Sequence, residues 1–505
     1  MLHFTTLSHW MVTLRDRLFG VQPAMVSLSR PPLSQLARLP VDALPKPVRD
    51  CPEAMKYLAL LGDLDWEHFP ERPTNRAWPG PTPAPRAPFA AAYLVKLEEH
   101  LLTFKKLHEF LVKHPALVWV LGFPLAPADV QPWGFDAARS VPSRKQLGRV
   151  LRELDNAALQ FLLAASVQCI ADALPPDIDF GDIIALDTKH IIAWVKENNL
   201  KTFVRNRYDK AQHPKGDPDC RLGCKRKENS APSAQGGGES RPAPDNTPTT
   251  EGNPASETLP PLSKGEYYWG YASGIVVTRL AEWGEFVLAE LTQTFDHGDT
   301  TYFFPLMAQV EKRLGFRPRF GALDAGFDAF YVYDYFHSDD HDGFAAVPFS
   351  EKGGKPSRQF AEDGRPLCAA ALPMHLKFVY TDRTTAIIPY QRAKYVCPLL
   401  DSQSDAAGCP VNHKLWPKNG CTTTLANTPG ARIRHQLDRE STTYKQVYDQ
   451  RTATERIFSQ AVALDIERPK LRNQAAITNQ NTLTYLLLNL REMRRLQEKL
   501  ESAAD

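Results

Sequence analysis

The chain has 505 residues, of which 43% are apolar and 23% are charged, as in an ordinary folded globular protein. This composition excludes wholesale disorder, a collagen-like repeat and a disulfide scaffold, and the length predicts roughly two to four domains. The 60 basic and 58 acidic residues give a formal net charge of +2. Any nucleic-acid partner must therefore be bound by local basic patches and not by a global positive field.

From the N-terminus, residues 1–89 are expected to form a partly helical leader. Prolines cluster between Pro70 and Pro88, which predicts an extended connector at its end. The first residues lack a basic stretch followed by an apolar core, so we expect no signal peptide. The sequence contains no uninterrupted apolar run of about 18 residues, so we expect no transmembrane helix. Together with eight scattered cysteines, these features favour a reducing, cytoplasmic location.

Residues 90–175 have leucines at helical spacing and are predicted to be helical. A basic helix within this region makes it the candidate DNA-binding region. Within it, Ser143 follows a proline and is expected to cap a helix. Three basic residues of that helix, Arg144, Lys145 and Arg149, lie away from its apolar stripe. They fit either contacts to DNA or a solvated surface helix.

From residue 176 the pattern becomes α/β. Apolar runs predict strands at 183–186, 274–280, 286–291 and 319–323, and a helical pattern covers 302–314. The low-complexity stretch 225–264 is predicted to be disordered. Residues 331–443 contain short β-like runs near 378–380, 386–388 and 395–396, and are interpreted as a β-rich insertion. The last part, 444–505, is predicted to be helical over 444–464 and 479–500.

Three carboxylates are candidates for chemistry. Asp187 and Asp324 each follow an apolar strand, and active-site groups of α/β domains commonly lie at the carboxyl ends of strands. The third, Glu455, lies on a predicted helix whose polar face also carries Tyr448 and Arg451. A single aspartate after a strand most often caps the next turn, so the prediction depends on the three together.

Three sequence elements occur in a fixed order along the chain: Leu186-Asp187, then Leu323-Asp324-Ala325-Gly326-Phe327-Asp328, then Tyr448-x-x-Arg451-x-x-x-Glu455-Arg456-Ile457-Phe458-Ser459. This set resembles the bacterial insertion-sequence DDE transposases, over most of the chain beyond about residue 90. The resemblance implies an RNase H-like mixed-sheet core in which Asp187, Asp324 and Glu455 form the acidic triad. It also implies a β-rich insertion before the glutamate helix. One departure is Val462, where family members often carry lysine or arginine.

The chemistry of such a triad is metal-dependent. Two Mg²⁺ (or Mn²⁺) ions about 3.5–4 Å apart can activate a water or a 3′-hydroxyl and stabilise an in-line displacement at phosphorus. Mg²⁺ prefers oxygen ligands, so a few carboxylates and substrate phosphate suffice. The resemblance implies strand cleavage at terminal inverted repeats and strand transfer into target DNA. Double-stranded DNA, a homodimer on that DNA and association with the bacterial nucleoid follow from the same resemblance.

Basic residues gather between Lys201 and Lys227, where nine lysines and arginines stand against three aspartates. From this segment Arg205, Arg207 and Lys210 are predicted to contact DNA phosphates, although charge runs are more commonly solvated. Tyr448 and Arg451 are placed to hold the DNA backbone beside Glu455.

The insertion carries one further candidate site. Cys397, Cys409, His413 and Cys421 lie within 25 residues in a segment rich in turn-forming residues. Three cysteines and one histidine are a recognised ligand set for structural Zn²⁺. Reduced, buried cysteines are the alternative.

Two other functions fit the same residues. The chain could be a non-catalytic DNA-binding protein descended from a transposase, or a metal-dependent nuclease that cleaves without joining. Short inverted repeats flanking the gene would favour a mobile element.

Overall fold

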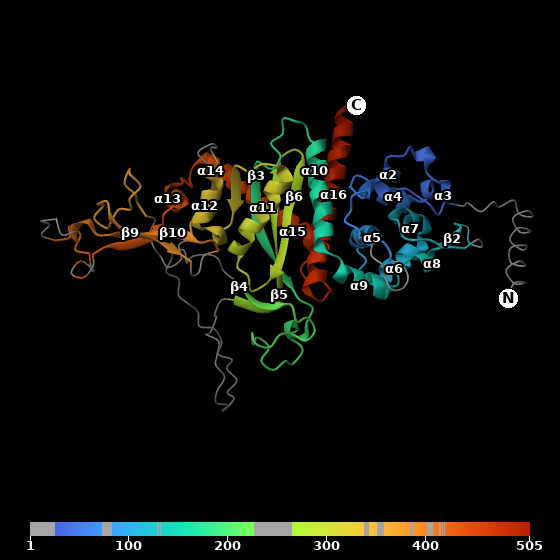
Figure 1. The fold of residues 1–505 in the computed structure, drawn as a ribbon, viewed down its shortest axis with the longest axis horizontal. Coiled ribbons are helices and arrows are strands. Elements are labelled where there is room, and N and C mark those ends of the chain that lie inside the picture. The colour runs from blue at the N-terminus through green and yellow to red at the C-terminus, as the bar shows by residue number, and fades with distance from the viewer. Residues whose placement is uncertain are drawn as a thin grey trace, which may run out of the picture.

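Three parts follow one another along the long axis of the molecule: a helical N-terminal unit, a central mixed sheet and a small antiparallel sheet (Figure 1). The computed structural model describes residues 26–72, 83–128, 131, 133–226, 265–337, 343–350, 358–383, 387–400, 408–413, 416, 418 and 420–504. The predicted α/β class is confirmed, with a mixed sheet and many helices.

Short helices build the N-terminal unit, and their apolar sides share one core. They are α2 (Leu33–Ala37), α3 (Lys46–Arg49), α4 (Pro52–Leu61), α5 (Ala87–Glu98), α6 (Phe104–Lys113), α7 (Pro115–Leu121), α8 (Ala137–Ser140) and α9 (Arg144–Glu153), with a two-residue pairing of β1 (Ala126–Pro127) and β2 (Phe135–Asp136). The longer helix α10 (Asn156–Ala173) follows them and packs against the central part of the molecule (Figure 1). Ser143 caps α9 as predicted, because its side chain accepts the N–H of Gln146. Residues 73–82 of the proline-rich connector lie outside the described residues.

The central sheet joins an antiparallel meander to parallel strands. Its strands are β3 (Ile183–Ile192), β4 (Arg221–Arg226), β5 (Gly265–Leu280), β6 (Gly284–Thr294), β7 (Phe320–Leu323) and β8 (Phe344–Ala346). β4 and β6 both pair with β5, along different stretches of that strand. Along the stretch that pairs with β6, the strand order is β6-β5-β3-β7-β8. The pairs β6–β5 and β5–β3 are antiparallel, whereas β3–β7 and β7–β8 are parallel.

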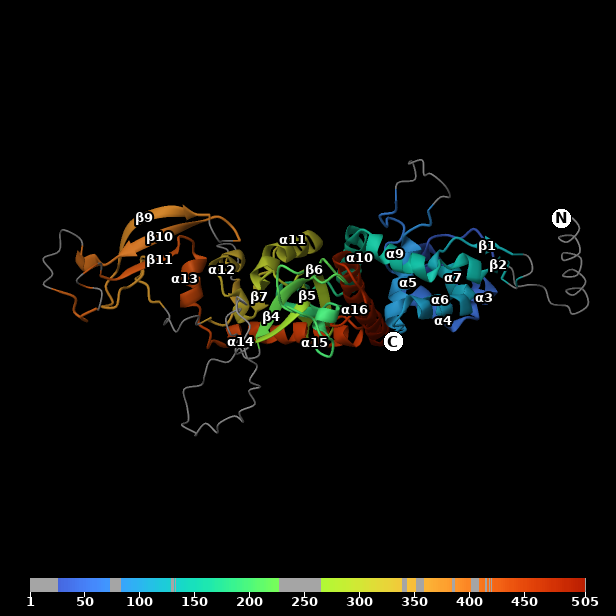
Figure 2. The ribbon, with the colours of Figure 1, turned by 90° about the horizontal axis from the view of Figure 1, so that it is seen from below.

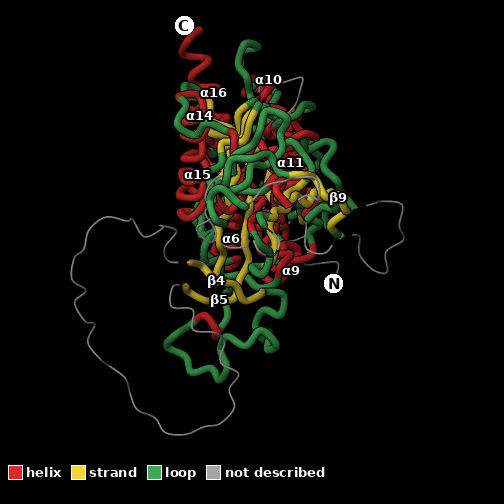
Figure 3. Tube along the Cα trace, turned by 90° about the vertical axis from the view of Figure 1, so that its left-hand side faces the viewer, coloured by secondary structure: helices red, strands yellow, loops and turns green. Residues whose placement is uncertain are grey.

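Three strands, β3, β5 and β6, are longer than the sequence predicts. β3 does not end at Asp187 but continues to Ile192, because β5 pairs with it as far as Gly270. β5 begins at Gly265, and this first part runs with β4 away from the body of the sheet (Figure 3). Lys225 and Arg226 therefore belong to β4, and the rest of the predicted disordered segment, 227–264, lies outside the described residues.

Helices cover both faces of the sheet (Figure 2). On one face lie η3 (Asp299–Tyr302) and α11 (Phe303–Leu314), and on the other lies α15 (Thr452–Ala463). The approach of η3 to the sheet requires glycine at position 274, since a Cβ there would be 2.4 Å from the Tyr302 ring. The Tyr302 hydroxyl also donates to the Ala272 carbonyl at 2.8 Å.

The third part follows α12 (Phe330–Phe336). Its antiparallel sheet has the order β11-β10-β9, and its elements are β9 (His375–Asp382), β10 (Tyr390–Val396), β11 (Thr422–Ala426) and α13 (Gly430–Gln436). The strand expected at 386–388 is wrong for Ile387 and Ile388, which form a bend between β9 and β10, and residue 386 lies outside the described residues. Because β8 pairs with β7, the central sheet includes residues beyond 330.

The C-terminal part returns to the central sheet as helices. α14 (Thr442–Tyr448), η6 (Asp449–Arg451), α15 and α16 (Gln474–Ala504) cover both predicted helical segments. Within the part of the chain that is described, no single helix is long and apolar enough to cross a bilayer. The stretches 137–153 and 156–173 reach that threshold only as a pair, which is bent by 78°.

Candidate active site

Asp187 and Asp324 lie side by side because their strands are adjacent and parallel. β3 and β7 pair in the register that sets Leu186 opposite Leu323. The residues that follow therefore take equivalent positions, with their side chains on the same face. The structure thus brings together two of the three predicted carboxylates.

These two carboxyl groups concentrate negative charge in a largely buried place. Burial, together with the charges of Asp324 and Asp299, raises the pKa of Asp187 to about 7. Burial and Asp299 also raise the pKa of Asp324. The backbone N–H groups of Thr188 and Gly326 donate to Asp187 and Asp324 at 2.7 and 2.8 Å, and offset only part of this effect. Such a site is stabilised by a nearby cation.

Arg451 is the cation that the chain supplies. It ends η6, which packs against β3 and β7. Its Nη1 lies 3.4 Å from Asp187 Oδ2, and its Nη2 lies 2.5 Å from Glu455 Oε1. The Glu455 side chain is 55% exposed and that of Asp187 only 18%. The third predicted carboxylate is therefore linked to the other two through Arg451, at the open side of the site.

The helix of Glu455 is held by its opposite face. The apolar residues of that face are buried, namely Ala453, Ile457, Phe458 and Ala461. The 3₁₀ turn η6 separates α14 from α15, so the predicted segment is not one regular α-helix. Tyr448 still lies near Arg451, whose guanidinium carbon is 6.0 Å from the tyrosine ring centre. Tyr448 also stacks on Tyr444, with ring planes 14° apart.

A fourth carboxylate, which the sequence analysis did not select, faces the same aspartates. Asp299 begins η3, and its Oδ1 accepts a hydrogen bond from the Thr188 hydroxyl at 2.8 Å. A Cβ placed on Gly326 would be 2.9 Å from Asp324 Oδ1 and 3.3 Å from Asp299 Oδ2. Both carboxylates therefore flank this glycine. The sequence offers one signal for Asp299, namely an aspartate in the loop after the predicted strand 286–291. Asp296 gives the same signal and lies nearer to that strand, so the sequence alone does not select Asp299.

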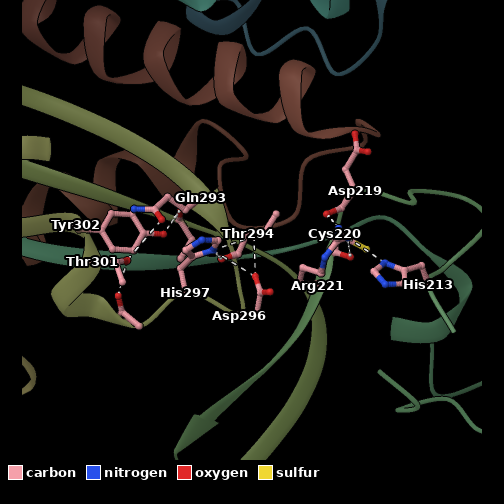
Figure 4. A network of polar contacts seen from close by, with 12 residues as sticks. His213, Asp219, Cys220, Arg221, Gln293, Thr294, Asp296, His297, Thr301 and Tyr302 are labelled. Atoms are coloured by element: carbon pink, nitrogen blue, oxygen red, sulfur yellow. Dashed lines mark hydrogen bonds and ion pairs between the residues drawn. The ribbon is translucent and has the colours of Figure 1, made fainter. Parts of the chain in front are cut away.

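Asp296 is held within its own turn instead (Figure 4). Its Oδ1 accepts from the Thr294 hydroxyl at 2.6 Å, and the same hydroxyl lies 3.0 Å from His297 Nδ1. Asp296 is exposed. It is a natural control for Asp299, because the two aspartates share one loop and only Asp299 reaches the buried carboxylates.

The donor set suits a hard divalent cation, since carboxylate oxygens are the ligands that Mg²⁺ prefers. Burial, and then the neighbouring carboxylates, raise the pKa of Asp187 and Asp324, and a bound cation would favour their charged forms. As the side chains stand, no group of three or more His, Cys, Asp or Glu in the described residues is gathered closely enough to hold a metal ion. Arg451 lies between Asp187 and Glu455. A metal ion could be bound by both carboxylates only if the Arg451 guanidinium moved.

The predicted DNA contacts fall in two other places. Arg144, Lys145 and Arg149 are exposed on α9, in the N-terminal unit, while its apolar residues are buried. Arg149 also forms an ion pair with Glu153 at 3.8 Å. The basic face of α9 is thus accessible.

The loop after β3 carries the second group. Arg205 and Lys210 are exposed there. Arg207 is not available in the same way, because its guanidinium donates to the backbone carbonyls of residues 197, 199 and 202. It braces the loop, a role that sequence spacing does not reveal.

The candidate zinc ligands Cys397, Cys409, His413 and Cys421 lie in the third part of the molecule, around β10 and β11. All eight cysteines of the chain are free thiols.

No known family model matches the chain, and no curated protein resembles it significantly in sequence. Function therefore has to be inferred from the site itself.

Proposed function

We propose that the protein is a DNA transposase that cleaves phosphodiester bonds at the ends of a mobile element and joins them to target DNA. The observation that carries the proposal is the pairing of Asp187 and Asp324 on adjacent parallel strands, with Arg451 linking them to Glu455. An RNase H-like core is part of the proposal. It is supported by the mixed β6-β5-β3-β7-β8 sheet, in which an antiparallel meander is continued by two parallel strands.

Each carboxylate has a distinct role in this proposal. Asp187 and Asp324 would hold the divalent cations from the buried side, and Glu455 would close the site from the exposed side. Bound cations would supply an activated water or 3′-hydroxyl and stabilise the charge that develops on the phosphate. Arg451, released from Asp187 and Glu455, carries a planar set of donors that suits a backbone phosphate.

Two basic surfaces outside this site would bind the DNA. The exposed face of α9 carries Arg144, Lys145 and Arg149, and the loop after β3 carries Arg205 and Lys210. Contacts of this kind position the duplex without reading its sequence. Each lost phosphate contact should reduce the dependence of binding on salt by about one unit of slope.

The test is cleavage of a labelled duplex that carries the inverted repeats flanking the gene, with Mg²⁺ or Mn²⁺. Wild type is compared with Asp187→Asn, Asp324→Asn and Glu455→Gln, and with Asp296→Asn as the control carboxylate. We expect metal-dependent cleavage in wild type and control, and loss of at least about a hundredfold in the three variants, which should still bind DNA.

The outcomes separate the rival functions. Binding without cleavage by wild type would contradict the transposase and favour a non-catalytic DNA-binding protein. Cleavage without joining to a target plasmid would favour a nuclease. Cleavage that survives Glu455→Gln but not Asp299→Asn would make Asp299 the third ligand.

A further inference from the structure

The four cysteines of the third part lie in one neighbourhood, at separations wider than metal-binding distance. Cys421 directly precedes β11. Its sulfur accepts a hydrogen bond from the backbone N–H of Ala369, the residue after Cys368. On its other side Cys421 follows Gly420, where a Cβ would be 2.7 Å from Cys397 Cβ and 3.1 Å from Cys397 Sγ. The sulfurs of Cys368, Cys397 and Cys409 are all near enough to Cys421 to act on it electrostatically.

Three of these cysteines share a local structure. Cys368, Cys397 and Cys409 each begin a turn in which their own carbonyl accepts the N–H three residues later, from Ala371, Leu400 and Asn412 respectively. Ala371 and Asn412 take left-handed φ values of 56° and 46°. Such turns cost backbone free energy in residues other than glycine, and they bring several N–H groups toward one side, where thiolate charge would be stabilised.

The surrounding core is too small to explain the ordering of this part. The apolar cluster of the three-stranded sheet contains six buried residues, Met374, Ala393, Tyr395, Leu425, Ala426 and Ala431, with Cys368 and Cys421 packed against it. Small units with so little apolar core usually depend on a disulfide or a metal. Every cysteine here is a free thiol.

We propose that Cys368, Cys397, Cys409 and Cys421 bind one structural Zn²⁺. The set differs from the one expected from sequence, because Cys368 takes the place of His413. Sequence spacing missed Cys368, which is 29 residues before Cys397 and reaches the group only through the turn that Ala369 and Ala371 complete. The proposal does not depend on the function proposed for the acidic site.

Zinc binding would change the charge state of the group. Burial, and then the negative charge of the neighbouring cysteines, raises the pKa of the Cys421 thiol. In the described residues the four sulfurs do not stand at metal-binding distance from one another. A bound Zn²⁺ would draw the four sulfurs together as thiolates, the ligand form that zinc takes, with release of their protons to solvent.

The experiment measures the metal content of the purified full chain, and then the absorption spectrum after exchange with Co²⁺ alone. We expect about one zinc per chain and the strong visible bands of tetrahedral cobalt thiolate. Cys368→Ser should lose the metal, whereas His413→Ala should retain it. Cys224→Ser, on β4 of the central sheet, is the matched control and should also retain it.

Three results would overturn the proposal. In the first, the wild-type chain takes up neither zinc nor cobalt. In the second, Cys368→Ser retains zinc and His413→Ala loses it. In the third, the four thiols react with a thiol reagent only after disulfides have been reduced. Hydrogen exchange of β3 and β5 shows whether the central sheet of each variant is folded, and exchange of β10 shows the same for the three-stranded sheet. Should Cys368→Ser fail to fold, the cobalt spectrum of wild type still decides, because four thiolate ligands and three give different charge-transfer intensities.

Discussion

The guanidinium of Arg451 lies between two carboxylates that come from distant parts of the chain. One partner, Glu455, is four residues away on the same face, so helical spacing predicts this pair. The other, Asp187, is 264 residues away, and no local pattern could reveal that contact. The sequence predicted the residue types of the site, and tertiary packing decides which of them meet.

Asp299 gives a direct test of the site. Asp299→Asn keeps an acceptor for the Thr188 hydroxyl but removes a negative charge beside Asp187 and Asp324. Groups that orient metal ligands typically change metal affinity or activity by about 10–100-fold. We therefore expect the Mg²⁺ concentration for half-maximal cleavage to rise by about that factor. Asp296→Asn in the same loop should stay within about twofold, and equal effects of the two variants would exclude a specific role for Asp299.

Glu290 predicts a pH dependence of stability. It is fully buried on β6, and burial raises its pKa, although Thr482, Thr292 and Gln160 donate hydrogen bonds to it. An unfolded glutamate loses its proton near pH 4.3. Above that pH the unfolded state is deprotonated while the folded state still binds a proton. The stabilisation from Glu290 is therefore complete below about pH 4.3 and is lost as pH rises through the folded pKa.

The measurement is the free energy of unfolding of wild type and Glu290→Gln at pH 5 and pH 8. Glutamine does not titrate, so the decrease between the two pH values should be smaller in the variant. Glu498→Gln, an exposed change on α16, should reproduce the wild-type decrease. A variant with an undiminished decrease would show that Glu290 is not the titrating group.

At the scale of elements, a side chain of α16 forms hydrogen bonds with the backbone of the edge strand β6. In the described sheet β6 pairs only with β5, and its register shifts between Val287 and Ala289. Asn489 on α16 accepts from the Val287 N–H at 2.8 Å and donates to its carbonyl at 2.9 Å. Both backbone groups are buried, so no water can replace these bonds. An edge strand is thereby protected from pairing with another chain.

Asn489→Leu should therefore destabilise the protein by about 2–4 kcal/mol, because it leaves a buried donor and a buried acceptor without partners. Urea unfolding would measure this. Glu498→Ala, which is exposed on the same helix, should change the free energy of unfolding by less than about 0.5 kcal/mol. An effect of Asn489→Leu as small as that would mean that the Val287 groups find other partners.

Element types were more predictable from sequence than element lengths. The apolar cores of β3, β5 and β7 were visible because buried strands read as continuous apolar runs. The extension of β3 over 188–192 was not, since Thr188, Lys189 and His190 look like a loop. They are held in the strand by pairing with Ser273, Ala272 and their neighbours on β5, and the Lys189 ammonium pairs with Glu467 at 2.8 Å.

At the scale of the whole molecule, one continuous apolar core extends from the N-terminal helices into the central sheet. α16 joins them: Asn479 donates to the carbonyls of Leu151 and Leu154, and Arg491 pairs with Glu98 at 2.8 Å. The core shows no break at the domain boundary expected near residue 90, because α4, which precedes that boundary, packs against α7 and α16, which follow it. Sequence composition marks linkers but cannot show which helices pack together.

This arrangement predicts two levels of stability. The N-terminal helices and the central sheet should unfold in one transition, since they share a core. The three-stranded sheet has its own small cluster and should open at lower free energy. Native-state hydrogen exchange would show slow, matched exchange in α5, α10 and β5, and faster exchange in β10. Equal protection of β10 and β5 would contradict separate opening.

The register of β3 on β7 makes the site sensitive to length as well as to chemistry. Deleting one residue between Ile184 and Leu186 would leave both aspartates in the gene, yet turn Asp187 to the opposite face of the sheet. Changes of length in the turn after Gly315, outside the paired residues, would leave that alignment intact. Selection on such a gene should therefore retain single-codon insertions and deletions between the strands and remove them within β3, even at β3 positions where a substitution is tolerated.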